Sequence, residues 1–183
     1  MKLLKKILGR KEPSRVVVLI DFENLLLSIE NRSSPVEKEF SVGAGFHAAI
    51  RKIAQEIGEV THIFVFVPPH AANLWGKLFQ QERFTIVFCP KIINKEGQEV
   101  DTVDPTIIDF GKWAIANIQG LTHLCIGSGD KDFQPLVKEA VMKGLEIIVI
   151  FSSEKSLSRE LRKLADKTYY FSPVPAGVPA GSQ

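Results

Sequence analysis

Carboxylates stand at the ends of two apolar segments, where they could do chemistry together. Asp21 closes the run over residues 16–20, and Asp130 and Asp132 follow the run over 121–126 in a glycine-rich turn. Carboxylates are costly to bring together without a cation. The pattern therefore indicates a metal site, and hydrolysis of phosphodiester bonds is the natural chemistry for it.

A third group of carboxylates surrounds the start of a predicted helix over 106–118 and consists of Asp101, Asp104 and Asp109. The sequence leaves open which of the three joins the metal site. Asp104 directly precedes a proline and would also make a good N-cap, and Asp109 would favour the helix dipole. Asp130 and Asp132 could likewise cap the helix that follows them.

Mg²⁺ and Mn²⁺ are the ions that suit such a site, because hard cations prefer oxygen ligands. The chain has no Walker A sequence, no complete GxGxxG and no CxxC. Its histidines show no metal-ligand spacing and are interpreted as structural or surface residues: His47, His62, His70 and His123.

The elements that must position these residues alternate between strand and helix patterns. Strands are predicted over 16–20, 63–67, 84–88, 121–126, 145–151 and 168–171, and helices over 45–57, 71–82, 106–118, 133–142 and 157–165. Residues 91–103 read as a loop or hairpin. This alternation predicts an α/β fold with a parallel sheet covered by helices on both faces.

Strand order decides whether the carboxylates meet. If the first five strands lie in the order third, second, first, fourth, fifth, then the first and fourth are neighbours. Asp21 then lies beside the turn of Asp130, and the N-terminus of the helix over 106–118 reaches the same edge. Ligands bind outside the carboxyl ends of the strands in open α/β sheets.

Charge and composition set the domain boundaries. Residues 1–15 hold six Lys or Arg and one Glu, so the rest of the chain carries −3 of the total net charge of +2. We predict a basic N-terminal arm over 1–14, one domain over 15–172 and a disordered tail rich in Pro, Gly, Ala and Ser over 173–183. The arm could contact nucleic acid or an anionic membrane, or be a solvated terminus.

Cysteine usage and hydropathy bear on location. Cys89 and Cys125 lie inside apolar runs and are predicted to be buried thiols in a reducing compartment. No apolar run approaches the roughly 20 residues that span a bilayer, and the basic start is a poor signal peptide. The sequence therefore predicts a cytoplasmic protein without a transmembrane segment.

Three motifs together resemble a known family. They are Asp21-Phe22-Glu23-Asn24-Leu25, a D-x-x-N motif; Val103-Asp104 followed by Asp109; and Ser128-Gly129-Asp130-Lys131-Asp132-Phe133-Gln134-Pro135-Leu136. The chain resembles the NYN domain family of LabA-like proteins, which is related to PIN-domain nucleases. The resemblance covers residues 15–172, and the nine-residue motif is its specific part.

The resemblance implies a PIN-like (Rossmann-like) three-layer fold with a central, mostly parallel sheet of five to six strands. It also implies a ribonuclease that depends on Mg²⁺ or Mn²⁺. Carried over by position, the catalytic and metal-binding quartet would be Asp21, Asp104, Asp130 and Asp132. Asn24 would support a water on the metal or the substrate, Ser128 would orient an aspartate or a phosphate, and Lys131 would contact phosphate.

Two other functions remain open at this point. The same acidic pocket could serve a non-catalytic RNA-binding or regulatory module. A phosphate-transfer protein would use Asp21 as nucleophile, but Lys131 and Thr122 do not fill the places of its Lys or Thr partner. The expected partner is single-stranded or structured RNA, and a homodimer is left open.

Overall fold

The computed structural model describes residues 13–30 and 46–171. Its strands are β1 (Arg15–Asp21), β2 (Glu59–Val67), β3 (Thr85–Phe88), β4 (Ile92–Ile93), β5 (Glu99–Val100), β6 (His123–Gly127), β7 (Glu146–Phe151) and β8 (Lys167–Tyr170). Its helices are α2 (Phe22–Glu30), α4 (Phe46–Ile57), α5 (Pro69–Gln81), α6 (Val103–Asn117), the 3₁₀ turn η2 (Lys131–Phe133), α7 (Gln134–Met142) and α8 (Arg159–Leu164).

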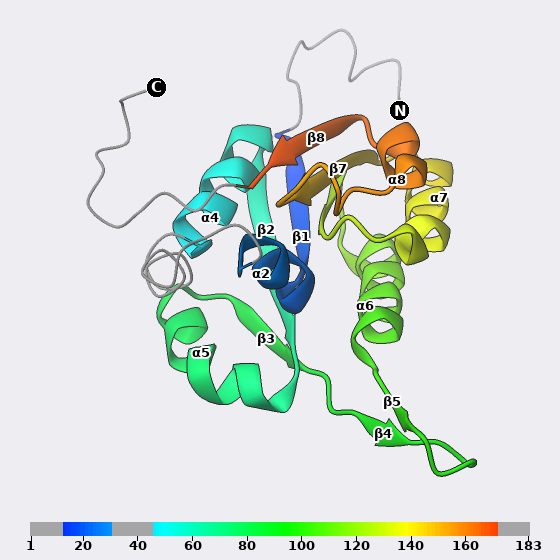
Figure 1. Cartoon of the computed structure of the whole chain (residues 1–183). Helices are drawn as coiled ribbons and strands as arrows, with labels where there is room; N and C mark the ends of the chain where they lie inside the picture. Colours follow the sequence, from blue (N-terminus) through cyan, green and yellow to red (C-terminus); the bar gives the residue numbers. More distant parts are fainter. Residues whose placement is uncertain (1–12, 31–45, 172–183) are drawn as a thin grey trace, which may run out of the picture.

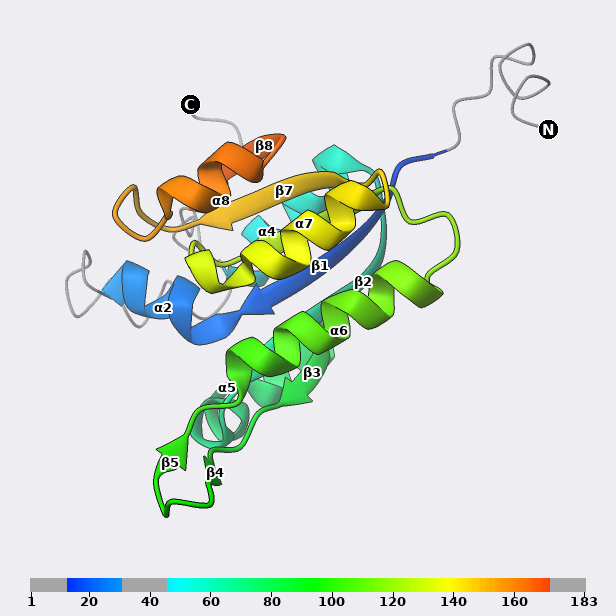
Figure 2. The same cartoon turned by 90° about the vertical axis from the view of Figure 1, so that its right-hand side faces the viewer.

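Six strands form one sheet in the order β3-β2-β1-β6-β7-β8, and each neighbouring pair is parallel. The predicted order of the first five strands is therefore confirmed. Helices α4 and α5 cover one face of the sheet, and α6, α7 and α8 cover the other (Figures 1 and 2). The three-layer α/β architecture expected of a PIN-like fold is confirmed.

Strand β1 shows why the run over 16–20 is continuously apolar. Val16, Val18 and Ile20 belong to the core cluster under α4 and α5. Val17 and Leu19 belong to the cluster under α6 and α7. A strand buried on both faces has no polar side to offer, as is usual in parallel sheets.

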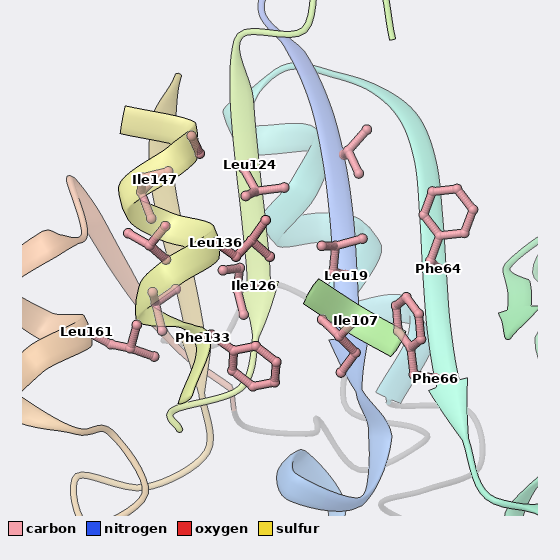
Figure 3. Packing of buried hydrophobic residues seen from close by; sticks show 14 of the residues in the cluster. Leu19, Phe64, Phe66, Ile107, Leu124, Ile126, Phe133, Leu136, Ile147 and Leu161 are labelled. Carbon is pink, nitrogen blue, oxygen red and sulfur yellow. The ribbon is translucent and has the colours of Figure 1, made fainter. Parts of the chain in front are cut away.

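The second core cluster also fixes the helix that carries Asp104. Figure 3 shows Ile107 of α6 against Leu19 of β1, and Leu136 of α7 near Ile126 of β6. Helices α6 and α7 approach closely at Gly111, where an added Cβ would lie 2.5 Å from Cδ2 of Leu136. Such a separation is far below van der Waals contact, so the Leu136 side chain occupies the space that a side chain at position 111 would need.

The carboxyl ends of the strands form one edge of the molecule. Ile20 of β1 pairs with Gly127 of β6, so the loops after these strands begin side by side. Figure 2 shows α2, the start of α6 and the β4–β5 hairpin on this side of the sheet. Among the described residues, no helix is long and apolar enough to cross a membrane.

The structure differs from the sequence predictions at several boundaries. Helix α2 was not predicted, because it begins at Phe22 directly after the last residue of β1, with no turn residue between them. Helix α6 begins at Val103, three residues before the predicted start. By contrast, the segment 91–103, predicted as a loop or hairpin, contains the hairpin of β4 and β5, so this prediction is confirmed. The predicted arm lies almost entirely, and the tail entirely, outside the described residues.

Candidate active site

Asp21 is the buried carboxylate of the carboxyl edge. It is the last residue of β1, and only 7% of its surface is exposed. Its Oδ1 accepts a hydrogen bond from the backbone N–H of Asn24 at 3.1 Å. Its Oδ2 accepts one from the hydroxyl of Ser128 at 3.3 Å. The α2 N-terminus and the turn after β6 therefore meet at this one side chain.

Burial raises the pKa of Asp21 from 3.8 to about 7. The hydrogen bonds from Asn24 and Ser128 oppose this shift, whereas the negative charges of Asp104 and Glu23 add to it. The dominant cause is the loss of hydration of the carboxylate. Without a cation nearby, an ionised Asp21 is therefore costly, and its burial also disfavours a role as an accessible nucleophile.

Ser128 connects Asp21 to the acidic turn. Its side chain is fully buried, and its Oγ accepts a hydrogen bond from the backbone N–H of Asp130 at 3.3 Å while its hydroxyl donates to Asp21. The side-chain Oδ1 of Asn24 accepts a long bond of 3.5 Å from the N–H of Gly129. Both residues that the sequence placed beside the acidic group thus link α2 and β1 to the turn after β6.

Gly129 holds this turn against the loop that precedes α8. The backbone N–H of Ser158 donates to the carbonyl of Gly129 at 2.8 Å. An added Cβ at position 129 would lie 1.9 Å from the carbonyl oxygen of Ser156, which leaves no room for any side chain. The glycine between Ser128 and Asp130 is thus required by packing.

Three carboxylates converge in front of the turn. Asp104, Asp130 and Asp132 each offer one oxygen, and these oxygens all lie within 4.8 Å of one another. Asp104 comes from the first turn of α6, and the other two come from η2 and the residue before it. We call these three residues the acidic triad. Asp21 lies outside the triad, so the predicted quartet is arranged as three carboxylates with a fourth buried behind them.

Of the three middle aspartates, only Asp104 belongs to the acidic triad. Asp101 is exposed and accepts a hydrogen bond at 2.9 Å from the N–H of Val103, so it orders the start of α6. Asp109 is exposed and lies one turn beyond Asp104. The N-cap of α6 is Thr102, so the alternative in which Asp104 caps the helix is wrong.

The alternative in which Asp130 and Asp132 cap the following helix is correct in part for the turn after β6. Asp130 is the N-cap of η2, and its Oδ1 accepts a hydrogen bond from the N–H of Asp132 at 3.0 Å. A carboxylate has two oxygens and about four lone pairs, so one such bond leaves capacity for a ligand. Lys131, between the two aspartates, has an exposed side chain.

The donor set of the triad fits a hard divalent cation. Carboxylate oxygens a few ångströms apart can be brought onto one ion with small adjustments, because Mg²⁺ binds oxygen at roughly 2.1 Å. The pKa of Asp104 is raised, first by burial and then by the charges of Asp130, Asp132 and Asp101. Among the ion pairs of the described residues, none involves a triad carboxylate or Asp21.

Two neighbours of this site were not predicted from the sequence. Glu23 adds to the negative charge around Asp21 and is paired with His70 of α5, with 3.2 Å between Oε1 and Nε2. Its place within the Asp21–Leu25 motif was the available signal. Lys91, at the base of the hairpin, is paired with Glu99 at 3.0 Å. Nothing in the sequence placed the hairpin beside the site, because its position depends on where β3 and α6 lie in the fold.

Cys89 and Cys125 are both buried and are free thiols, as predicted. Burial is the main cause that raises the pKa of each. Neither is therefore poised as a nucleophile.

Comparisons with known proteins agree with this architecture. A family model described as NYN domain matches residues 15–173. The fold is similar to the crystal structure of a protein of unknown function from Vibrio parahaemolyticus, with a TM-score of 0.68 and 15% sequence identity over 90% of this chain and 96% of that chain. At this identity the likeness concerns the fold alone. No curated protein sequence matches the chain.

Proposed function

The chain belongs to the NYN domain family and has a PIN-like, nuclease-type domain with an acidic cluster, and from this premise we propose that it is a ribonuclease dependent on Mg²⁺ or Mn²⁺. The observation that carries the proposal is the convergence of Asp104, Asp130 and Asp132, none of which forms an ion pair with another described residue. A cluster of this kind destabilises the fold unless it binds a cation, so its presence argues for a function.

The acidic triad would hold the ion. A bound divalent cation lowers the pKa of water and neutralises the charge that develops on a phosphate during hydrolysis. Asp104 reaches the site from α6 and the other two carboxylates from the turn after β6, so the two halves of the site are independent elements of the fold.

Asp21 and Ser128 would orient the triad. Ser128 donates to Asp21 and accepts from the N–H of Asp130, so the buried carboxylate fixes the turn through one hydroxyl. Asn24 accepts a hydrogen bond from the N–H of Gly129 in the same turn and would support a water on the metal or the substrate. The side chain of Lys131 is exposed and would contact a phosphate of single-stranded RNA.

The experiment that tests the proposal compares the parent protein with Asp130→Asn on labelled single-stranded RNA in Mg²⁺ and in Mn²⁺. The amide oxygen of asparagine can still accept the hydrogen bond from the N–H of Asp132, so the turn should keep its shape while the site loses a charge. We expect cleavage by the parent and loss of at least about 99% of the rate in the variant, as is usual when a group that stabilises transition-state charge is removed.

Circular dichroism and a thermal melt establish that the variant is folded. If Asp130→Asn cleaves RNA as fast as the parent, another site or a contaminating nuclease is responsible, and the proposal fails. If the parent neither cleaves RNA nor gains stability from Mn²⁺, the non-catalytic RNA-binding or regulatory module becomes the better description.

A further inference from the structure

Residues 1–8 carry a sequence pattern that the proposed function does not use. Apolar residues stand at Met1, Leu3, Leu4, Ile7 and Leu8, and lysines at Lys2, Lys5 and Lys6. At helical spacing, the apolar residues would share one side of a helix and the lysines the other. This pattern is typical of a helix that lies in the surface of a membrane. Residues 1–8 lie outside the described residues, so the pattern is a property of the sequence. We call them the amphipathic segment.

The apolar side of the amphipathic segment favours lipid over nucleic acid as its ligand. Phosphate contacts require cationic side chains, and large apolar residues at every third or fourth position add nothing to such contacts. An anionic membrane uses both sides of the pattern, because acyl chains accept the apolar residues and anionic headgroups attract the lysines. Residues 1–15 hold six Lys or Arg and one Glu, a net charge of +5, which supplies this attraction.

The structure fixes the place where this part of the chain joins the domain. The strands of the sheet begin at one edge, the amino edge, and β1 begins there at Arg15. The carbonyl of Ser14 accepts a hydrogen bond from the N–H of Glu59 at 2.6 Å, and the N–H of Arg15 donates to Oγ1 of Thr122 at 2.7 Å. The chain is therefore held between the starts of β2 and β6 directly before β1.

The length of the linker keeps the amphipathic segment near the amino edge. Residues 9–13 separate the segment from Ser14, and five extended residues span at most about 18 Å. Strand β1 then runs from Arg15 to Asp21, and a strand rises by roughly 3.3 Å per residue. The acidic triad lies beyond the far end of β1. Anionic headgroups would repel its carboxylates, so charge also favours an orientation in which the carboxyl edge faces away from the membrane.

The amino edge carries exposed apolar side chains of its own. Met142 is 80% exposed, the largest fraction among the eight exposed large apolar side chains that the structure describes, and Val141 is 48% exposed. Lys138 precedes them by three and four residues, so the three side chains share one side of α7. Figure 2 shows this end of α7 on the same side of the molecule as the start of β1. We call Lys138, Val141, Met142 and the exposed Lys143 the amino-edge patch.

We propose that the amphipathic segment and the amino-edge patch together bind the domain to the surface of a membrane that contains anionic lipids. Residues 138–146 hold two lysines and two glutamates, so the electrostatic attraction comes from the segment and the patch adds apolar contact. The inference goes beyond the proposed function and does not depend on it, because the carboxyl edge stays open to solvent whatever it binds.

The test measures co-sedimentation of the whole chain with vesicles of phosphatidylcholine alone and of an equal mixture with phosphatidylglycerol. We expect the parent to bind the mixed vesicles only, and less tightly as salt rises. The double variant Leu4→Gln/Ile7→Gln keeps every charge and removes two apolar side chains. It should bind the mixed vesicles about tenfold or more weakly, because their burial among acyl chains is lost. Met142→Gln should bind them several-fold more weakly.

The matched control is Ile92→Gln/Ile93→Gln in the β4–β5 hairpin at the carboxyl edge. It makes the same chemical change at two side chains that are 51% and 67% exposed, and it should bind the mixed vesicles as the parent does. Thermal melts establish that each variant is folded, and light scattering measures its oligomeric state. Cleavage of RNA in solution should be the same in the parent and in Leu4→Gln/Ile7→Gln, so that failure of this inference and failure of the proposed function are distinguishable.

The inference is overturned if the parent does not bind the mixed vesicles or if Leu4→Gln/Ile7→Gln binds them as the parent does. Loss of binding to single-stranded RNA by that variant, with vesicle binding kept, would make the segment a nucleic-acid element instead. Dissociation of an oligomer by that variant would show that a second copy of the chain covers the apolar side. Equal losses in the hairpin control would contradict the orientation, and unchanged binding by Met142→Gln would remove the patch from the interface.

Discussion

The strands of the sheet begin at its amino edge and end at its carboxyl edge. Polar and charged groups have partners at the amino edge, whereas the aspartates that gather at the carboxyl edge are not neutralised by an ion pair with a described residue. At the amino edge, the hydroxyl oxygen of Thr122 accepts from the N–H of Arg15 at 2.7 Å and also meets Nδ1 of His123 at 2.7 Å. The other nitrogen of His123 lies 3.2 Å from Glu146. At the carboxyl edge, four aspartates gather around the turn after β6, and within the described part of the chain no ion pair neutralises them.

The difference is what we would expect if the amino edge serves stability and the carboxyl edge serves the proposed function. Groups that are matched by neighbours of opposite charge or by hydrogen bonds help to hold the sheet together. Carboxylates that repel one another lower the stability of the free protein and make sense only if something binds them. Substitutions at the two edges should therefore have opposite consequences, and the following predictions test this from the largest expected effect to the smallest.

The largest effect is expected at the middle aspartates of the carboxyl edge. Asp104→Asn removes a triad ligand and should reduce cleavage of single-stranded RNA by about a hundredfold or more. It should also remove most of the rise in melting temperature that Mn²⁺ produces. Asp109→Asn, which makes the same chemical change one turn along the same helix, should keep both properties. Equal losses in the two variants would contradict the assignment of the triad.

The next prediction concerns Asp21 and the way in which the free energy of unfolding depends on pH. It applies to the metal-free protein, so the measurements are made in EDTA. The pKa of Asp21 is about 7 in the folded protein against an ordinary value of 3.8. The folded state therefore binds more protons than the unfolded state between these pH values, so this group makes stability fall as pH rises from about 4 to about 7. The full effect is at most roughly 4 kcal/mol.

The measurement compares urea unfolding of the parent and of Asp21→Asn from pH 4 to pH 8. An asparagine at position 21 can still accept from the N–H of Asn24 and can donate to Ser128. The variant should not show the fall in stability with rising pH that Asp21 causes in the parent. It should be the more stable of the two proteins at pH 8. If the parent and the variant show the same dependence on pH, Asp21 is not the buried titrating group.

At the amino edge we expect substitutions to lower the stability of the protein instead of raising it. Thr122→Val removes the oxygen that accepts from the N–H of Arg15 and also removes the partner of His123. We expect a loss of about 1–3 kcal/mol in the free energy of unfolding, because a partly buried donor loses its acceptor. Cleavage and the response to Mn²⁺ should not change. Thr168→Val, at an exposed position of β8, is the control and should change stability by less than about 0.5 kcal/mol.

The smallest effect is expected for Lys131. If its ammonium contacts one phosphate, Lys131→Ala should weaken binding of single-stranded RNA only several-fold and lower the salt slope by about one. Lys155→Ala, in the loop before α8, changes an exposed lysine in the same way and serves as comparison. A slope that is the same in the parent and in Lys131→Ala would show that Lys131 points into solvent.

The sheet could be predicted from the sequence because its central strands are buried on both faces. Continuous apolar runs such as residues 16–20 and 147–151 leave little choice of structure. Helix α2 was missed for the opposite reason, since Phe22 follows Asp21 with no glycine, proline or polar turn between strand and helix.

The site was only partly predictable. The sequence predicted which segments come together at the carboxyl edge. It did so because they follow strands whose order in the sheet could be predicted. The choice among Asp101, Asp104 and Asp109 depended on where α6 begins, and Pro105 suggested a start later than Val103. The separation of Asp21 from the triad depends on side-chain directions, which spacing in sequence does not contain.

If the acidic triad binds a metal ion, as proposed, the packing of α6 against α7 at Gly111 would bear on which ion it prefers. Asp104 lies on α6, roughly two helical turns before Gly111, whereas Asp130 and Asp132 lead into α7. The side chain of Leu136 fills the space that a methyl group at position 111 would need. Because Leu136 is fully buried, an alanine at position 111 would force the Leu136 side chain, or the helices that hold the two residues, to move. Since Mg²⁺ demands shorter bonds and stricter geometry than larger ions, a change of one methyl group about 10 Å from the ligands can alter ion preference while every ligand stays in place.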